Sequence, residues 1–429
     1  MTKHRPLKGQ VFIPGDKSIS HRAIMLGALA SGTTTVHNFL HSLDCISTIK
    51  AFQQMGVNIE FDTKESIFII EGKGLHGLEK PSDVIDVGNS GTTMRLLSGI
   101  LSGQTFDSII TGDDSLRKRP MDRIISPLSK MGANIESQSN NGLPPLVITG
   151  RDNTLLSGIS YKSPVSSAQV KSSILLAGLY ADSNTSVIEP HLSRNHTELM
   201  LAYFGASIIQ EENITTIEAK ANLVGKDIQV PGDISSAAYF IVAGLIVPGS
   251  KLLLKNVGIN PTRDGIIDVC LQMGGKLQLD NVRVLNGEKV ADIYVEYSDL
   301  KGINIGGPII PRLIDELPII AVMACFASGQ TLITDAEELM VKETNRIDAM
   351  VKSLKTLGGD ITATHDGMII NGGKTLYGGR VDSKNDHRIA MSLAIADLMT
   401  RGHVDIVGKE CVNISYPNFF KDLASLSDK

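Results

Sequence analysis

Two kinds of helix-forming pattern alternate along this chain. The first kind is amphipathic, as in residues 121–130 and 341–356, and it ends in an apolar residue, a Gly and an alternating strand pattern. Copies of this ending start at Met55, Met131, Phe204, Met273 and Leu357. A Gly at this place is typical of a helix C-cap, so each copy predicts a helix that ends there and a strand that follows.

The second kind is rich in Ala, Leu, Ile and Ser and has few charges after its first turn. Such a segment predicts a helix that is buried on most sides. These segments begin near Lys17, Ser90, Ser166, Asp233, Asp315 and Asp386. Strand-like runs lie between them, for example at residues 66–70, 108–111, 146–149 and 251–254. The chain therefore predicts a repeat of two helices and several strands, six times over, at intervals of roughly 70 residues.

The two ends of the chain are expected to meet in one domain. The sixth amphipathic helix falls at residues 418–426, so we expect residues 7–13 to supply the strand of that last repeat. Residues 13–16, Ile-Pro-Gly-Asp, resemble residues 230–233, Val-Pro-Gly-Asp, half a chain apart. Two unrelated turns are the alternative reading. We predict one domain of residues 1–14 plus 232–429 and a second of 15–231, with a hinge at 13–16 and 229–233 that closes over a cleft.

Composition narrows the class of protein. The 429 residues carry 41 Lys+Arg and 46 Asp+Glu, a net charge of −5, with 4% aromatic residues and no Trp. This balance argues against a general nucleic-acid binder. The cysteines Cys45, Cys270, Cys325 and Cys411 never form a CxxC pair, which favours a reducing compartment without a zinc site. Residues 1–10 lack an apolar signal core, and no apolar run is long enough to cross a bilayer. We expect a soluble cytoplasmic protein.

The first turns of the buried helices are unusually polar. Their cations include Lys17, Arg22, Lys171 and Arg388. Plain capping explains Asp233 and Ser235, but cations are disfavoured at a helix N-terminus unless an anion is present. Several amphipathic helices also begin with cations, namely Arg119, Arg194, Arg263, Lys342 and Arg346, each of which is either a solvated charge or a ligand contact. The pattern predicts a site for a substrate with phosphate and carboxylate groups.

Two acids, Asp315 and Glu343, lie in these otherwise cationic segments. Their placement suits general acid–base chemistry better than binding alone. The sequence has no Ser-His-Asp order, no HExxH and no Walker loop, and the run at 88–91 is not a GxGxxG, so a dinucleotide is not indicated.

Separated motifs agree in order with one family. They are Gly-Asp-Lys-Ser with His-Arg at 15–22, Gly-Asn-Ser-Gly-Thr at 88–92, Arg-Pro at 119–120, Ser-Ala-Gln-Val-Lys at 167–171, Asp-Glu-Leu-Pro at 315–318, Val-Lys-Glu-Thr-Asn-Arg at 341–346 and Asp-His-Arg at 386–388. Over essentially its whole length the sequence resembles the EPSP synthases of the shikimate pathway. The resemblance implies a two-domain inside-out α/β barrel of six βαβαββ repeats, three per domain. It also implies a monomer that needs no metal or organic cofactor and has no nucleic-acid or membrane partner.

The family transfers the enolpyruvyl group of phosphoenolpyruvate to the 5-hydroxyl of shikimate 3-phosphate and releases phosphate. The resemblance implies Asp315, Glu343 and Lys17 as catalytic residues. It implies that shikimate 3-phosphate is bound by Lys17, Ser18, Arg22, Ser166, Ser167, Gln169, Arg194, Asp315 and Lys342. It implies that phosphoenolpyruvate is bound by Lys17, Gly91, Arg119, Gln169, Arg346 and Arg388.

Some features depart from the family pattern. Many members place a Lys where this chain has Ile414, and Lys409 is the possible replacement. Motifs around 167–171, 194–198 and 260–263 look like the class II subgroup, which is often glyphosate-tolerant, yet Gly91 is retained where some tolerant members have Ala. Binding of the inhibitor glyphosate is possible, and sensitivity to it stays open.

Two other functions compete with this reading. The UDP-N-acetylglucosamine enolpyruvyl transferases share the fold and the donor, but they place a reactive Cys where this chain has Asp114. The cysteines of this chain read instead as buried fillers away from the anion-binding turns. A non-enzymatic toroidal binding module is the other alternative, because repeated βα units also build clamps.

Overall fold

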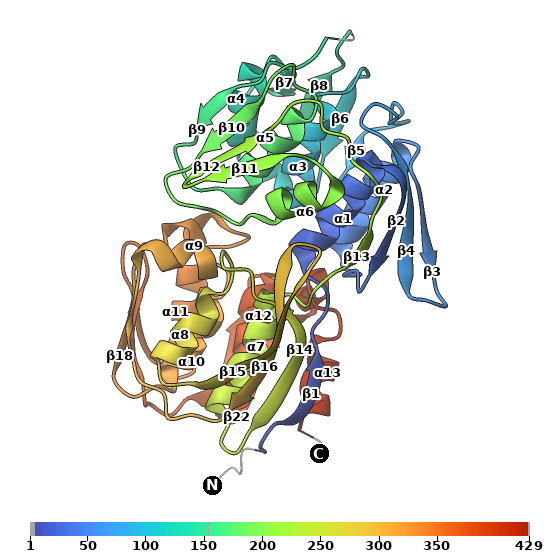
Figure 1. Cartoon of the computed structure of the whole chain (residues 1–429). Helices are drawn as coiled ribbons and strands as arrows, with labels where there is room; N and C mark the ends of the chain where they lie inside the picture. Colours follow the sequence, from blue (N-terminus) through green and yellow to red (C-terminus); the bar gives the residue numbers. More distant parts are fainter. Residues whose placement is uncertain (1–4, 153, 428–429) are drawn as a thin grey trace. The chain divides into compact units, whose positions relative to one another are not determined.

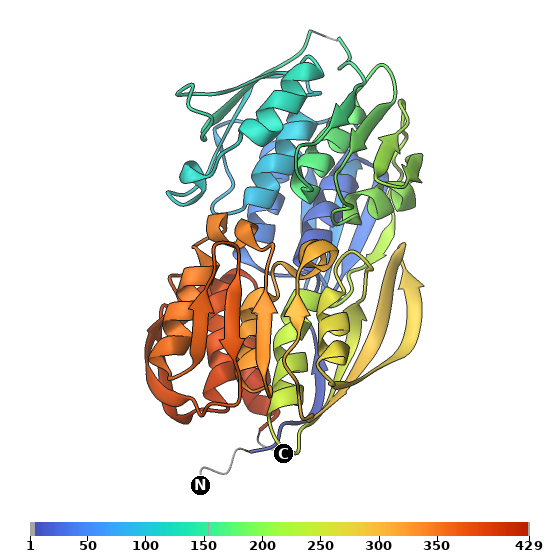
Figure 2. The same ribbon diagram turned by 90° about the vertical axis from the view of Figure 1, so that its left-hand side faces the viewer.

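The computed structural model describes residues 5–152 and 154–427. The chain forms two compact units. Unit 1 consists of Met1–Pro14, Pro231–Leu285 and Lys289–Lys429, and unit 2 of Gly15–Val230 with Asn286–Glu288. Each unit has a hydrophobic core of its own. Within each unit the sheets lie on the outside and the buried helices inside, while other helices such as α6 and α13 lie at the surface (Figures 1 and 2).

One pattern of elements repeats in both units. A strand leads into a buried helix, a parallel strand, a second helix and an antiparallel strand pair. In the first repeat of unit 2, α1 (Lys17–Leu29) and α2 (Leu43–Gln54) flank β2 (Ser31–His37), and β3 (Asn58–Asp62) and β4 (Ile67–Lys73) complete the sheet. β4 is antiparallel to both β2 and β3.

The other elements of unit 2 follow the same order. The second repeat has β5 (Ile85–Asp86), α3 (Gly91–Leu101), β6 (Ser108–Thr111), a 3-10 turn η1 (Leu116–Lys118), α4 (Asp122–Lys130), β7 (Asn134–Ser137) and β8 (Leu146–Thr149). The third has β9 (Ser160–Lys162), α5 (Ala168–Gly178), β10 (Thr185–Ile188), α6 (His196–Phe204), β11 (Ile208–Glu211) and β12 (Ile214–Ile217), and β13 (Asp227–Gln229) follows it. The buried helix α3 packs against both α5 and α1.

Unit 1 repeats the arrangement. Its elements are β1 (Lys8–Phe12), α7 (Ile234–Ile246), β14 (Lys251–Gly258), α8 (Gly265–Gln272), β15 (Lys276–Leu285), β16 (Glu288–Glu296), β17 (Asn304–Ile305), η2 (Gly307–Ile309), α9 (Ile310–Leu313), α10 (Leu317–Cys325), β18 (Gln330–Ile333), η3 (Glu337–Val341), α11 (Arg346–Thr356), β19 (Asp360–Ala363), β20 (Met368–Asn371), β21 (Tyr377–Asp382), α12 (His387–Asp397), β22 (Arg401–Val407), η4 (Lys409–Ile414) and α13 (Phe419–Ser425). The buried helices α7, α10 and α12 pack against one another.

The helix endings predicted from the sequence are confirmed. Helices α2, α4, α6, α8 and α11 each end one or two residues before the expected glycine, and a strand begins within a few residues. The φ angle is positive at every one of these glycines: Gly56, Gly132, Gly205, Gly274 and Gly358. A side chain would be strained in this left-handed conformation, so glycine fixes both the end of the helix and the direction of the chain.

The expected pairing of the N-terminal strand is wrong. β1 does not join the sheet of the last repeat, which contains β21 and β22, but pairs in parallel with β14. Buried Leu7 and Val11 contribute to the core of unit 1, and the backbone of Leu7 is hydrogen-bonded to Ser250 and Lys251 at the start of β14. In unit 2 the equivalent place beside β2 is taken by β13. The chain therefore passes between the units twice, so unit 1 is built from separate segments, whereas residues 15–230 supply nearly all of unit 2.

Candidate active site

In unit 2, Lys17 opens helix α1 beside a carboxylate of the protein. Its ammonium forms an ion pair with Asp44, which lies in the first turn of α2. Asp16 caps α1 by accepting a hydrogen bond from the backbone of Ile19 at 2.9 Å. The carboxylate of Asp44 therefore supplies at least part of the negative charge that stabilises Lys17 at the N-terminus of α1. The lysine side chain is only 23% exposed, so the pair also fixes where its charge lies.

Arg22, one turn further along α1, is buried and joins three helices. Its Nε donates to Thr197 at 2.6 Å, its Nη2 to Ser172 at 2.9 Å and its Nη1 to the Ser18 carbonyl at 3.0 Å. Burial lowers the pKa of Arg22 to about 10, although Glu198 and other acids oppose this shift. The group remains a cation at neutral pH, and its contacts hold the starts of α1, α5 and α6 together.

His21, next to Arg22 on α1, connects α1 to α2 and α3 through hydroxyl groups. Its Nδ1 lies 2.7 Å from the Thr48 hydroxyl, which in turn lies 2.7 Å from the Thr93 hydroxyl. Burial lowers the pKa of His21 well below its usual value, and the charges of Lys17 and Arg22 lower it further. The ring is therefore neutral at physiological pH and acts as a hydrogen-bonding spacer rather than a cation.

The start of α3 brings Gly91 next to two arginines. A Cβ atom at this position would lie 3.1 Å from Nη1 of Arg95 and 3.4 Å from Nη1 of Arg119. Arg95 donates to Oε1 of Gln169 at 2.5 Å, and Nε2 of that amide donates to Thr92 at 3.1 Å. Gln169 thus links α5 to α3. Nη2 of Arg119 donates to Asn89 at 2.9 Å and to Ser115 at 3.3 Å, which leaves Nε and Nη1 of its guanidinium for an anion.

Ser166 and Ser167 precede α5. Ser167 caps the helix, and Ser166 both donates to the His191 carbonyl at 2.6 Å and accepts from the His191 backbone at 3.0 Å. These bonds fasten the start of α5 to the loop that leads to Arg194, two residues before α6. The structure therefore brings three residues of the predicted shikimate 3-phosphate set to one part of unit 2.

Lys171 does not present its charge to a ligand. Its buried ammonium lies 2.8 Å from Glu189 and 2.7 Å from Glu198, and both carboxylates are themselves buried. It also lies 3.3 Å from the Ser193 carbonyl, next to Arg194. The sequence pattern grouped Lys171 with the anion-binding cations. The structure corrects this, because the anions that stabilise it are two carboxylates from distant parts of the sequence.

In unit 1, Arg346 gathers three carboxylates at the start of α11. Its Nε lies 2.8 Å from Asp386, its Nη1 3.1 Å from Asp315 and its Nη2 2.6 Å from Glu343. Burial alone would lower the pKa of Arg346, but Asp386, Glu343 and Asp315 outweigh it and raise the pKa. The two acids predicted to be catalytic therefore lie on neighbouring nitrogens of one fixed guanidinium.

Two further predicted cations lie around Asp315. Nζ of Lys342 is 4.0 Å from Oδ1 of Asp315 and 2.6 Å from the exposed Glu338. Nη2 of Arg388, on α12, is 3.6 Å from Oδ2 of Asp315. The Asp315 side chain is 12% exposed, so it is accessible while surrounded by positive charge. This position suits a carboxylate that accepts a proton from a substrate.

Sequence reasoning missed several supporting residues. Asp44 and Asp386 hold predicted cations, and Arg95 lies beside Gly91. Arg95 stands in the polar first turn of a buried helix, a signal that could have identified it. Asp44 gave no such signal, because acidic residues near helix starts are ordinary caps, whereas Asp386 belongs to the Asp-His-Arg motif at 386–388 but had been assigned no role.

The thiol of Cys45 lies closer to the site than the sequence indicated. Its Sγ is 3.8 Å from the Lys17 carbonyl, which contradicts the view that no cysteine lies near these turns. Burial raises the pKa of Cys45 to about 12, so it is a poor nucleophile. Cys411 is only partly buried, in contrast to the filler role expected for it. Asp114, in the place of the reactive cysteine of the alternative family, is exposed.

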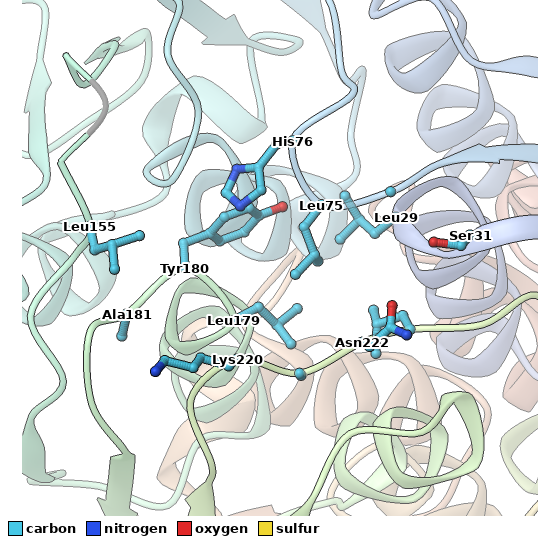
Figure 3. A pocket seen from close by; sticks show the side chains of 13 residues that line it. Leu29, Ser31, Leu75, His76, Leu155, Leu179, Tyr180, Ala181, Lys220 and Asn222 are labelled. Carbon is cyan, nitrogen blue, oxygen red and sulfur yellow. The ribbon is translucent and has the colours of Figure 1, made fainter.

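A cavity of about 340 Å³ in unit 2 is separate from these residues. Figure 3 shows Tyr180 with His76 beside it, and Leu29, Leu179 and Lys220 in the wall. Leu29 and Leu179 stand at the C-terminal ends of α1 and α5, whereas Lys17 and Ser167 stand at their N-terminal ends. The cavity therefore lies away from the polar helix starts.

The described residues contain no group of three or more His, Cys, Asp or Glu that could hold a metal ion. Within the same residues, no helix is long and apolar enough to cross a membrane.

Comparison with known proteins decides the family. Residues 1–423 match the family model of EPSP synthase (3-phosphoshikimate 1-carboxyvinyltransferase). The chain belongs to the EPSP synthase family. A 3-phosphoshikimate 1-carboxyvinyltransferase of Thermoanaerobacter sp. is 56% identical over 419 residues, covering 98% of this chain and 97% of the relative. One of Bacillus pumilus is 54% identical over 426 residues, covering 99% and 98%. The EPSP synthase structure of Acinetobacter baumannii matches with a TM-score of 0.90 at 48% identity, covering 98% of this chain and 96% of that one.

These matches confirm the family and the two-domain α/β fold predicted from the motifs. They favour the EPSP synthases over the UDP-N-acetylglucosamine enolpyruvyl transferases and over a non-enzymatic clamp.

Proposed function

We propose that this member of the EPSP synthase family transfers the enolpyruvyl group of phosphoenolpyruvate to the 5-hydroxyl of shikimate 3-phosphate and releases phosphate. The family match supports the reaction. One structural observation carries the assignment of residues. Arg346 fixes Asp315 and Glu343 on adjacent nitrogens, at 3.1 Å and 2.6 Å, so that two proton-transfer groups stand side by side among cations.

In the proposed mechanism, Asp315 accepts the proton of the 5-hydroxyl. The hydroxyl oxygen forms a bond to the central carbon of phosphoenolpyruvate, and the methylene carbon gains a proton through Glu343. The resulting tetrahedral intermediate then loses phosphate as its C–O bond breaks, and the methyl group gives up a proton to restore the double bond. Atoms and charges balance without a metal or organic cofactor. The cations stabilise the anionic oxygens of both substrates as charge moves between them.

Binding is assigned to the residues implied by the motifs. We assign shikimate 3-phosphate to Lys17, Ser18, Arg22, Ser166, Ser167, Gln169, Arg194, Asp315 and Lys342, and phosphoenolpyruvate to Lys17, Gly91, Arg119, Gln169, Arg346 and Arg388. The hydrogen bonds of Ser166 to His191 and of Lys171 to the Ser193 carbonyl support a fixed position for Arg194. Within the described residues, both side-chain hydrogen bonds of Arg119 use Nη2, and Arg388 has no carboxylate closer than 3.6 Å, which supports their role as donors to an anion.

Some finer assignments accompany this proposal. We place the enzyme in the cytoplasm as a monomer, and glyphosate at the phosphoenolpyruvate residues around Gly91. Lys409 is exposed at the start of η4, and Ile414 is partly buried at its end, so Lys409 remains the proposed replacement for the missing Lys. Size-exclusion chromatography with light scattering tests the monomer, and an inhibition curve tests glyphosate.

The decisive experiment mixes the protein with phosphoenolpyruvate and shikimate 3-phosphate and follows inorganic phosphate together with the mass of the product. We expect phosphate and the enolpyruvyl ether of shikimate 3-phosphate in equal amounts. Phosphate release with UDP-N-acetylglucosamine instead, or no release with either acceptor, would overturn the proposal.

A further inference from the structure

A buried chain of polar groups lies behind Asp315 in unit 1. The next residue, Glu316, has a fully buried carboxylate. Its Oε1 accepts a hydrogen bond from the hydroxyl of Ser235 in the first turn of α7. A buried carboxylate lowers the stability of the fold unless charged or polar groups compensate it, so packing alone does not account for Glu316 at this position.

Arg263 fixes the direction of this chain. Its Nη2 donates to Ser235 Oγ at 2.6 Å and to Asp233 Oδ1 at 3.2 Å. A guanidinium has donors only, so the Ser235 oxygen accepts from Arg263 and its single hydrogen points to Glu316. Glu316 is thereby an acceptor, and its carboxylate is held in place from the side of α7.

The carboxylate of Glu316 faces Arg388. Nη1 of Arg388 lies 3.9 Å from Glu316 Oε1, and its Nη2 lies 3.6 Å from Asp315 Oδ2. The same Nη1 donates to the Asp315 carbonyl at 3.3 Å. Arg388 therefore lies between two carboxylates at similar distances and forms a short bond with neither. Arg346 differs, because it is within 3.1 Å of each of its three carboxylates.

We propose that Glu316, held by Arg263 through Ser235, is a positioning residue that keeps Arg388 from closing on Asp315. The attraction of Glu316 balances that of Asp315, so Arg388 keeps its donors for phosphoenolpyruvate instead of pairing closely with Asp315. This inference rests on the proposed function, since it concerns the same two substrates. Without the charge of Glu316, Arg388 is attracted to Asp315 alone and pairs with it directly.

Steady-state kinetics of Glu316→Gln tests this role, because the amide keeps the shape and removes the charge. We expect the KM for phosphoenolpyruvate to rise roughly 10- to 100-fold, in the range of a lost charged interaction, and kcat to fall. The KM for shikimate 3-phosphate should stay within about twofold. Ser235→Ala leaves Glu316 in place without its anchor and should shift the same constants in the same direction by less.

Asp292→Asn is the matched control. Asp292 is also a buried acid of unit 1, paired with Lys255 and bonded to Asn256, but it lies on β16. We expect it to lower the melting temperature and leave the kinetic constants unchanged. Unchanged phosphoenolpyruvate KM in a folded Glu316→Gln enzyme would overturn the inference, as would equal changes for both substrates. If Glu316→Gln does not fold, wild-type constants in Ser235→Ala would overturn it. An inactive wild-type enzyme would instead refute the proposed function.

Discussion

Nη1 of Arg346 lies 3.1 Å from Oδ1 of Asp315, although 30 residues separate the two along the chain. The same guanidinium bonds to Asp386 through Nε and to Glu343 through Nη2. Most N–H groups of Arg346 therefore bond to these three carboxylates, and a substrate anion can use only the remaining ones. Its main effect is to set the positions of Asp315 and Glu343.

Removal of Asp315 or Glu343 should therefore lower the rate of the chemical step more than the affinity for the substrates. We predict that Asp315→Ala and Glu343→Gln each lower kcat by two or more orders of magnitude, as is usual for lost acid–base groups. Steady-state phosphate release measures this effect. Glu338→Gln provides a control, since this exposed acid contacts only Lys342 among the residues above. A near-normal kcat for Asp315→Ala would exclude it as the base.

A methyl group at Gly91 should weaken binding of the enolpyruvyl donor. In Gly91→Ala the new Cβ would lie 3.1 Å from Arg95 Nη1, so the arginines must shift by a few tenths of an ångström. We expect the KM for phosphoenolpyruvate to rise about tenfold, while that for shikimate 3-phosphate changes little, because misplaced donors lose binding energy.

Gly379→Ala is the control for this substitution, because its Cβ would meet the nearest atom at an ordinary 3.6 Å. It should leave both KM values unchanged. An unchanged phosphoenolpyruvate KM in Gly91→Ala would show that the arginines absorb the methyl group without loss.

Lys171 should matter for stability rather than for binding. Lys171→Met leaves the buried Glu189 and Glu198 without their cation, which typically costs about 3–5 kcal/mol of unfolding free energy. Urea unfolding measures the loss. The exposed pair of Lys251 with Glu296 provides the comparison, and Lys251→Met should cost much less, because solvent screens an exposed ion pair. Equal losses in the two variants would contradict the buried-cluster interpretation.

His21 should make the protein sensitive to mild acid. Burial holds the pKa of His21 below that of the unfolded chain, so the unfolded chain binds more protons once the pH falls below the usual histidine pKa of about 6.5. Stability is then complete above that pH and decreases below it, by at most about 1.4 kcal/mol per pH unit for one proton. Melting temperatures measured from pH 7.5 to pH 5 should show a steeper fall for the wild type than for His21→Gln. Parallel curves would assign the acid sensitivity to other groups.

Local patterns predicted most of the fold. The apolar-Gly endings located the ends of five helices because a left-handed residue and a strand must follow within a few positions. The strand at 108–111 and the strand at 146–149 have the predicted bounds. Pairing between distant segments was harder, and β1 was assigned to the wrong sheet. A strand pattern carries the identity of its buried side chains but not of its hydrogen-bonding neighbour.

In the candidate site, too, local motifs were predicted correctly and contacts between distant segments were not. Motifs named Arg346, Asp315 and Glu343, and the structure brings these three together. The interpretation of Lys171 failed because its counter-ions, Glu189 and Glu198, come from segments whose proximity no spacing rule expresses. The position of a charged residue in the sequence does not indicate whether its partner is a substrate or another side chain.

The double crossing of the chain has a consequence for synthesis on the ribosome. Residues 15–230 include every strand of unit 2's sheets, so that unit can assemble once the first half of the chain has emerged. Strand β1 is made before unit 2 and must wait for its neighbour β14 at residues 251–258. During that interval its backbone N–H and C=O groups lack their final partners, which leaves β1 open to wrong association with other strands.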